Sequence, residues 1–219
     1  MNRCVIIGGA PIENYNRIKK YFRSGDYVIA CDCGLRHCDP LGIVPDLIVG
    51  DFDSFDRPDS DIEIIQLPVE KDDTDTMYAV KEAAARGYKS ILLTGMTGRR
   101  IDHTLGNIYM LVKLHELGLE AVIADDYSEL SLIAGRASEK SGRNSCTTAE
   151  VSGSFPYFSV IAIAGTASGI SIRNAKYPLE DAVIEPGFQY GISNEVLPGM
   201  TAEISVKDGM LLVIKDHEG

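Results

Sequence analysis

Basic side chains are scarce in this sequence of 219 residues. Lysine and arginine together number 21, against 32 aspartates and glutamates, and the formal net charge is −11. Neutralising a nucleic-acid backbone requires a Lys/Arg face, so this balance argues against a nucleic-acid partner. We expect an acidic protein that handles phosphates to use metal ions, and its field favours a cationic small substrate in an acidic cleft.

A long apolar run is also missing. No stretch approaches the roughly 20 residues that span a bilayer, which excludes a transmembrane helix. The start Met-Asn-Arg-Cys-Val-Ile-Ile-Gly-Gly leads into a strand-like segment instead of a signal peptide. With 45% hydrophobic and 24% charged side chains, the sequence predicts a compact cytoplasmic protein without a membrane partner.

The cysteines lack the even number and the paired spacing that a disulfide framework requires. There are five, in a chain without a secretion signal, which argues against disulfides. The cluster Cys31, Cys33, His37 and Cys38 invites a zinc interpretation, but a closed structural site usually pairs two such knuckles and no second one is present. We interpret Cys31 as the end of a buried strand and the other cysteines as small core or surface residues.

Short apolar runs alternate with helical stretches over the first 125 residues. This alternation is typical of βαβ units around a mostly parallel sheet with helices on both faces, so the predicted class is α/β. Helices are expected over Thr76–Arg86 and Leu105–Leu117, each ending before a glycine. The expected strands are Cys4–Ile7, Tyr27–Cys31, Leu47–Val49, Ile62–Leu67, Ser90–Leu93 and Ala121–Ala124.

After about residue 126 the helical period disappears. The pattern predicts a separate, smaller all-β domain over residues 127–219, following an α/β domain over residues 1–126. The polar stretch Ser138–Ser154 is expected to be a flexible loop within it. The expected strands are Leu130–Ala134, Phe158–Ala164, Gly169–Arg173, Thr201–Val206 and Met210–Ile214.

The strongest local signal is the segment Pro45–Ser54, in which an apolar strand ends in Asp51-Phe52-Asp53. Open α/β sheets bind ligands at this carboxyl end of their strands. If the chain stays extended, both carboxylates point the same way and can reach one hard cation, for which magnesium fits. The alternative is turn chemistry that satisfies backbone donors, although two adjacent like charges are costly without a cation.

A second acidic group, Asp72-Asp73-Thr74-Asp75, precedes the predicted helix. Asp73 or Thr74 could simply cap that helix. The number of acids exceeds what a cap requires, so we expect Asp72 or Asp75 to face the same metal or a substrate hydroxyl. Asp32 also ends a strand, and Gly34 would let the backbone approach a ligand there, although an N-cap explains Asp32 equally well.

A glycine-rich segment, Thr94–His103, joins a predicted strand to the predicted helix Leu105–Leu117. Its backbone, Arg99, Arg100 and the helix N-terminus together could bind a phosphate chain. The segment is neither a P-loop nor a dinucleotide fingerprint, because neither spacing is present. Solvated surface arginines are the alternative, and His103 beside Asp102 could be a structural pair as easily as a phosphate ligand.

Taken together, these segments resemble the thiamine pyrophosphokinase family over essentially the whole chain. The order and spacing of the matching pieces make chance agreement improbable. The pieces are Asp32 with Gly34, Pro45–Ser54, Asp72–Asp75 including Thr74, the block containing Gly98, Arg99, Asp102, His103, Leu105 and Asn107, and Gly191-Ile192-Ser193-Asn194.

The resemblance implies an N-terminal domain for ATP and magnesium, a C-terminal β-sandwich for thiamine, and a homodimer with active sites between subunits. It places magnesium on Asp51, Asp53 and Asp72, and thiamine on Ser193 and Asn194. Two departures stand out. The family's Asp-Gly-Gly is Asp32-Cys33-Gly34 here, and the tryptophan on which animal members stack thiamine is absent, so Phe188 or Tyr190 could offer the π face unless they are core residues.

The reaction implied by the resemblance is attack of the thiamine hydroxyl on the β-phosphorus of ATP, with AMP leaving. Arg99 or Arg100 would help magnesium neutralise charge, and Asp75 or Asp32 could accept the hydroxyl proton. The alternatives are a diphosphokinase acting on a pterin alcohol, an aspartyl phosphatase using Asp-x-Asp, and a non-catalytic thiamine or nucleotide sensor.

Overall fold

The computed structural model describes residues 3–52, 61–70, 72–135 and 147–217. The chain divides into two compact units. The first comprises Met1–Met110 and Leu119–Asp126, and the second comprises Leu111–Gly118 and Tyr127–Gly219. Within the described residues, no helix has both the length and the apolar character needed to cross a membrane.

A parallel sheet forms the centre of the first unit. Its strands are β1 (Arg3–Ile7), β2 (Tyr27–Cys31), β3 (Leu47–Gly50), β4 (Glu63–Gln66), β5 (Ser90–Thr94) and β6 (Glu120–Ala124). They lie in the order β4-β3-β2-β1-β5-β6, and neighbouring strands pair in parallel. The chain leaves β1 toward β2 and later returns to the other side of β1 as β5, which is the switch point where such sheets bind ligands.

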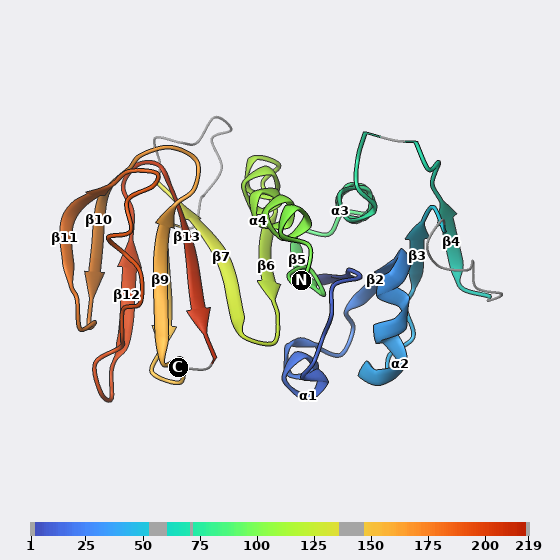
Figure 1. The fold of residues 1–219 in the computed structure, drawn as a ribbon, viewed down its shortest axis with the longest axis horizontal. Coiled ribbons are helices and arrows are strands. Elements are labelled where there is room, and N and C mark those ends of the chain that lie inside the picture. Colours follow the sequence, from blue (N-terminus) through green and yellow to red (C-terminus); the bar gives the residue numbers. More distant parts are fainter. Residues whose placement is uncertain (1–2, 53–60, 71, 136–146, 218–219) are drawn as a thin grey trace. The chain divides into compact units, whose positions relative to one another are not determined.

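Helices cover both faces of this sheet, as predicted. The short helices α1 (Tyr15–Ile18) and α2 (Cys38–Leu41) bury Ile18, Cys38 and Leu41 against one face. Helix α3 (Asp75–Ala85) buries Ala79, Val80 and Ala83 and lies on the opposite side of the sheet in Figure 1. Two 3-10 helices, η1 (Lys19–Tyr21) and η2 (Asp32–His37), precede and follow β2, and α4 (Ile101–Glu116) follows β5.

The second unit is a sandwich of two antiparallel sheets. One has the order β7-β13-β9 and the other β11-β10-β12-β8. Phe158, Val160 and Leu211 from the first sheet and Ile170 and Ile204 from the second share one buried cluster. The strands are β7 (Ser128–Ala134), β8 (Thr148–Ser152), β9 (Tyr157–Ala162), β10 (Ala167–Arg173), β11 (Leu179–Ile184), β12 (Thr201–Ser205) and β13 (Met210–Asp216).

The predicted fold class is confirmed, with corrections in detail. The expected loop Ser138–Ser154 is wrong over Thr148–Ser152, which form β8, while residues 136–146 lie outside the described part of the chain. Strand β11 was not predicted, because only Ile184 among its six residues is fully buried and the apolar pattern is weak. Helix α4 begins at Ile101, four residues before the predicted start.

The cysteine cluster behaves as core. Cys31 and Cys38 are buried, Cys33 is half-buried, and burial raises the pKa of the Cys38 thiol to about 11. Three or more metal-binding side chains do not come together anywhere in the described ranges. Burial agrees with the interpretation of Cys31 as the end of a buried strand and of Cys38 as a small core residue.

Candidate functional site

Two glycine loops meet at the switch point of the parallel sheet. The backbone N–H of Gly8 donates to the Thr94 carbonyl (2.8 Å) and that of Ala10 to the Gly95 carbonyl (2.9 Å), so the loops after β1 and β5 continue the strand pairing. A Cβ on Gly8 would lie 2.5 Å from the Gly95 carbonyl oxygen, and Gly95 has φ +65°. Only glycine allows this approach of the two loops.

The loop after β1 is also held from η2. The Arg36 guanidinium donates to the Gly9 carbonyl, and His37 Nε2 lies 2.9 Å from the Ala10 carbonyl oxygen. Since a carbonyl oxygen only accepts, Nε2 carries the proton, and Nδ1 accepts from the Tyr15 hydroxyl at 2.8 Å. Burial lowers the pKa of His37, so its neutral form maintains this arrangement.

Asp32 begins η2 with its backbone in the left-handed region, at φ 38°. Its Oδ2 accepts from the Cys33 thiol at 3.1 Å, whereas its buried Oδ1 has no hydrogen-bond partner among the described residues. Such an oxygen is costly to bury unless a ligand or cation completes it. Packing alone already requires glycine at position 34, because a Cβ there would lie 2.1 Å from the Ile7 carbonyl oxygen.

Asp51 follows β3 directly and is half-buried. Strands β2 and β3 pair with Cys31 opposite Val49, which brings Asp32 and Asp51 to neighbouring strand ends. The premise of an extended chain is wrong at Phe52, whose φ of 56° turns the backbone into the left-handed region. Asp53 lies outside the described residues, so its predicted pairing with Asp51 stays a prediction.

The second acidic group takes several separate positions. Thr74 caps α3 by accepting from the Met77 N–H (3.2 Å), which was the alternative for Asp73 or Thr74. Asp73 instead pairs with Lys81 (2.5 Å). Asp75 opens the helix, and its carbonyl lies 3.9 Å from the buried thiol of Cys31, near the end of β2. Asp72 is exposed.

We call residues 95–100, between β5 and α4, the arginine loop. The Asn107 side chain donates to the Met96 carbonyl (2.7 Å), and the Gly98 N–H donates to the Thr104 hydroxyl (3.0 Å). Asn107 and Gly98, predicted to bind the nucleotide, therefore shape this loop. Their direct contact with a nucleotide stays a prediction.

The two arginines lie at the exposed end of the arginine loop. Arg100 donates twice to the Asp102 carboxylate, at 2.6 and 3.3 Å, and this pairing lowers the pKa of Asp102 to about 2. Both partners are well exposed, so water screens the pair and an anion can compete for Arg100 at little cost. His103 is exposed on the first turn of α4.

The residues at this edge suit magnesium by their chemistry. Magnesium prefers oxygen ligands and is commonly bound by one or two carboxylates together with substrate phosphates. The incompletely bonded Oδ1 of Asp32 and the neighbouring carboxylate of Asp51 offer such oxygens. Substrate phosphate oxygens would complete the coordination.

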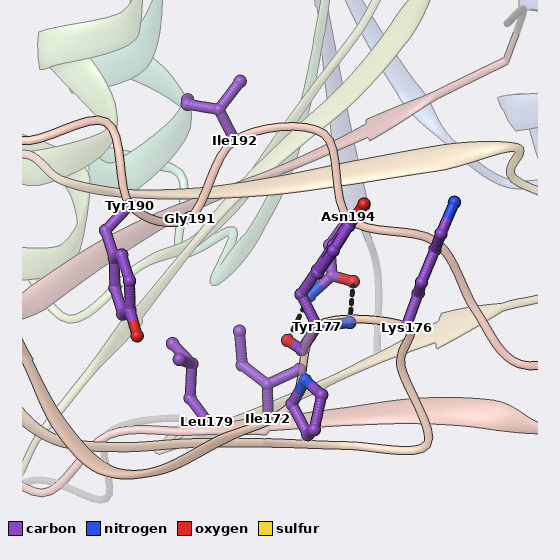
Figure 2. A pocket seen from close by; sticks show the side chains of 9 residues that line it. Ile172, Lys176, Tyr177, Leu179, Tyr190, Gly191, Ile192 and Asn194 are labelled. Atoms are coloured by element: carbon purple, nitrogen blue, oxygen red, sulfur yellow. Dashed lines mark hydrogen bonds between the residues drawn. The ribbon is translucent and has the colours of Figure 1, made fainter.

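A separate pocket of about 460 Å³ lies in the second unit. Tyr190 projects into it toward Leu179, while Ile192 points away from it, as Figure 2 shows. Tyr190 and Phe188 are both exposed, and their ring centroids lie 6.3 Å apart, so neither is the core residue that was the alternative. Lys176, also at the pocket, is neutralised by Glu195 at 2.5 Å.

Asn194 closes one side of this pocket and is fully engaged with backbone. Its Oδ1 accepts from the N–H groups of Tyr177 (3.0 Å) and Glu195 (2.9 Å), and its Nδ2 donates to the Tyr177 carbonyl (2.8 Å; Figure 2). Ser193 is exposed and has a φ of 57°, and its backbone N–H donates to the Ser159 hydroxyl. Asn194 thus builds the pocket wall, and its direct contact with a substrate stays a prediction.

Several residues of the site were not predicted. Thr97 donates to the Asp125 carboxylate at 2.5 Å, joining the loops after β5 and β6. Tyr15 and His37 support the loop after β1. Only their position in the sequence could have indicated these residues, because each lies just after a predicted strand or on the helix that follows one.

Comparisons with known proteins agree with this architecture. The profile described as "Thiamin pyrophosphokinase, catalytic domain" matches residues 18–123, and "Thiamin pyrophosphokinase, vitamin B1 binding domain" matches residues 147–211. The chain is 26% identical over 222 residues to the thiamine pyrophosphokinase of Bacillus subtilis, covering 97% of this chain and 98% of that protein.

Solved structures share the fold over the full length. The crystal structure of thiamine pyrophosphokinase from Bacillus subtilis has a TM-score of 0.83 at 24% identity, with 100% of both chains covered. That from Geobacillus thermodenitrificans has a TM-score of 0.79 at 26% identity, covering 99% of this chain and 98% of the other.

Proposed function

Because the chain belongs to the thiamine pyrophosphokinase family, we propose that it transfers the diphosphate of ATP to the hydroxyl of thiamine, giving thiamine diphosphate and AMP. One observation carries the proposal. Acidic strand ends and an arginine loop lie at the carboxyl edge of one parallel sheet, in a chain whose other half matches a vitamin B1 binding domain. That second match favours thiamine over the pterin alternative.

In the proposed reaction, the thiamine hydroxyl oxygen forms a bond to the β-phosphorus while the bond from that phosphorus to the α-β bridging oxygen breaks. The electron pair leaves with AMP, and the hydroxyl proton passes to a carboxylate, which is Asp75 if Asp32 holds magnesium. Arg99 and Arg100 bind the phosphate chain and stabilise its developing charge. Arg100 exchanges Asp102 for phosphate when the nucleotide binds.

Asp51 and Asp32, with Asp53 and Asp72, would hold magnesium. Bound there, the ion supplies charge neutralisation at the phosphate oxygens. The chain's own contribution is to fix Asp32 and Asp51 after the paired strands β2 and β3, so that little reorganisation is needed there when the substrates bind.

We assign nucleotide binding to residues 1–126 and thiamine binding to residues 127–219. The catalytic-domain match at residues 18–123 and the vitamin-binding match at residues 147–211 support this assignment. In the second unit, Tyr190 supplies the aromatic face for the cationic ligand, with Ser193 and Asn194 beside it. We also propose a cytoplasmic homodimer, for which sedimentation equilibrium should give twice the mass of the chain.

The proposal is tested by incubating the purified protein with ATP, magnesium and thiamine and resolving the products by chromatography and mass. AMP and thiamine diphosphate in equal amounts are expected. ADP with thiamine monophosphate would contradict diphosphate transfer. Phosphate release from monoesters without nucleotide would identify a phosphatase, and binding without product would identify a sensor.

A further inference from the structure

Four consecutive residues of the arginine loop are tied to three parts of the first unit. The Gly95 carbonyl accepts from the Ala10 N–H, and the Met96 carbonyl accepts from Asn107. Thr97 donates to Asp125, and the Gly98 N–H donates to Thr104. The anchors come from the loop after β1, from α4 and from the end of β6.

The two arginines that follow these four residues are not anchored in this way within the described structure. Arg99 and Arg100 are exposed, and Arg100 pairs only with the exposed carboxylate of Asp102 among the described residues. The loop therefore has a fixed base and an exposed cationic end. Such a base limits where two long, flexible side chains can place their guanidinium groups.

The bond from Thr97 to Asp125 differs from the other three anchors. A hydroxyl donating to a carboxylate makes a short, charge-assisted hydrogen bond, and the 2.5 Å separation agrees with that type. It also ties the arginine loop to the central sheet close to Arg99. Asp125 directly follows β6, and β6 pairs with β5, the strand that precedes the loop. The other anchors leave the Thr97 side chain itself unrestrained.

We propose that Thr97 and Asp125 act as positioning residues, holding the arginine loop so that Arg99 and Arg100 meet the phosphate chain of the nucleotide. This inference rests on the proposed function and extends it to two residues that contact neither substrate. Their effect on the reaction passes through the arginines.

The test compares Thr97→Val, which is nearly isosteric but lacks the hydroxyl, with Thr97→Ser, which keeps it. Thr97→Val is expected to raise both the Kd for ATP with magnesium, measured by titration calorimetry, and the KM for ATP by about tenfold, while the KM for thiamine stays unchanged. Thr97→Ser should recover most of the lost affinity. The exposed residue Thr166, in the second unit, provides the control Thr166→Val, which should leave both constants unchanged.

Asp125→Ala should also raise the Kd and the KM for ATP, and Thr97→Val should add little in the Asp125→Ala background, because the bond between the two residues is already lost there. A Thr97→Val variant with unchanged Kd and KM for ATP would overturn the inference, whatever its melting temperature. Equal loss in Thr97→Ser would also overturn it. If the wild type fails to bind ATP, the proposed function itself fails; if it binds ATP and Thr97→Val binds equally well, only the positioning role fails.

Discussion

At the scale of single residues, the proposed chemistry depends on the carboxylates at the sheet edge. Asp51 directly follows a buried strand, and Asp32 has a buried oxygen that lacks a hydrogen-bond partner among the described residues. Two carboxylates on adjacent strand ends repel one another unless a cation or phosphate-bound metal joins them. The arrangement is therefore explained better by binding than by stability.

Asp51→Asn should reduce turnover at least about 100-fold while leaving the fold intact, because it removes a charged ligand and little packing. Steady-state assays at several magnesium concentrations, with circular dichroism and thermal melting, check both parts. Asp39→Asn, an exposed change on α2, is the matched control and should keep full activity. Full activity of Asp51→Asn with unchanged magnesium dependence would remove Asp51 from the mechanism.

His37 gives the first unit a predictable response to pH. Burial lowers its folded-state pKa below the ordinary 6.5, so the unfolded chain binds more protons between the two values. Its contribution to stability is complete above pH 6.5 and is lost as the pH falls through the lowered pKa. Urea unfolding between pH 5 and 7.5 should show this decline.

The decline should be smaller in His37→Gln, which cannot titrate. Equal slopes in the wild type and in His37→Gln would show that another group is responsible.

At the scale of elements, helix α3 depends on its cap. Thr74 is the only side chain that caps α3 in the described structure, and it does so through the Met77 N–H. Thr74→Ala should lower the free energy of unfolding by about 1 kcal/mol, whereas Thr74→Ser should retain most of it. Chemical denaturation measures the difference, and an unchanged midpoint in Thr74→Ala would contradict the capping role.

In the second unit, Asn194 joins segments distant in sequence. Its backbone pairs with Phe158 in both directions, and its side chain holds the Tyr177 backbone. Asn194→Ala leaves several of these groups unsatisfied and should lower the free energy of unfolding by about 2 kcal/mol. Chemical denaturation of Asn194→Ala is compared with that of Ser193→Ala, whose side chain is exposed. A loss of stability in Asn194→Ala alone would show that the Asn194 side chain holds the pocket wall. A fully stable Asn194→Ala with a raised KM for thiamine would instead indicate direct substrate contact.

The sequence predicted elements well where burial is continuous. Tyr27–Cys31 has the predicted bounds, since four of its five residues are buried. In contrast, the first turn of α4 was missed because Ile101 and Leu105 are 65% and 50% exposed, so the apolar period there does not report a core. Strand β8 was missed because Val151 alone is fully buried, and its threonine and serine suggest a loop.

At the scale of the whole molecule, sequence order located the acidic strand ends but not their contacts. The order β1-β5-β6 decides that the loops after β5 and β6 meet, and no pattern in the sequence specifies that order. The hydrogen bond from Thr97 to Asp125 follows from this order, and the left-handed backbone at Phe52 is a separate feature of the chain after β3. They could not be predicted from local spacing.

The central claim is that the molecule moves a diphosphate as one group, and isotope transfer tests it most directly. The purified protein is given thiamine, magnesium and ATP carrying ³²P at the β-position, and each product is counted after separation. The account predicts unlabelled AMP and one label in thiamine diphosphate for every AMP formed. Label retained in ADP, with thiamine monophosphate as the other product, would contradict it.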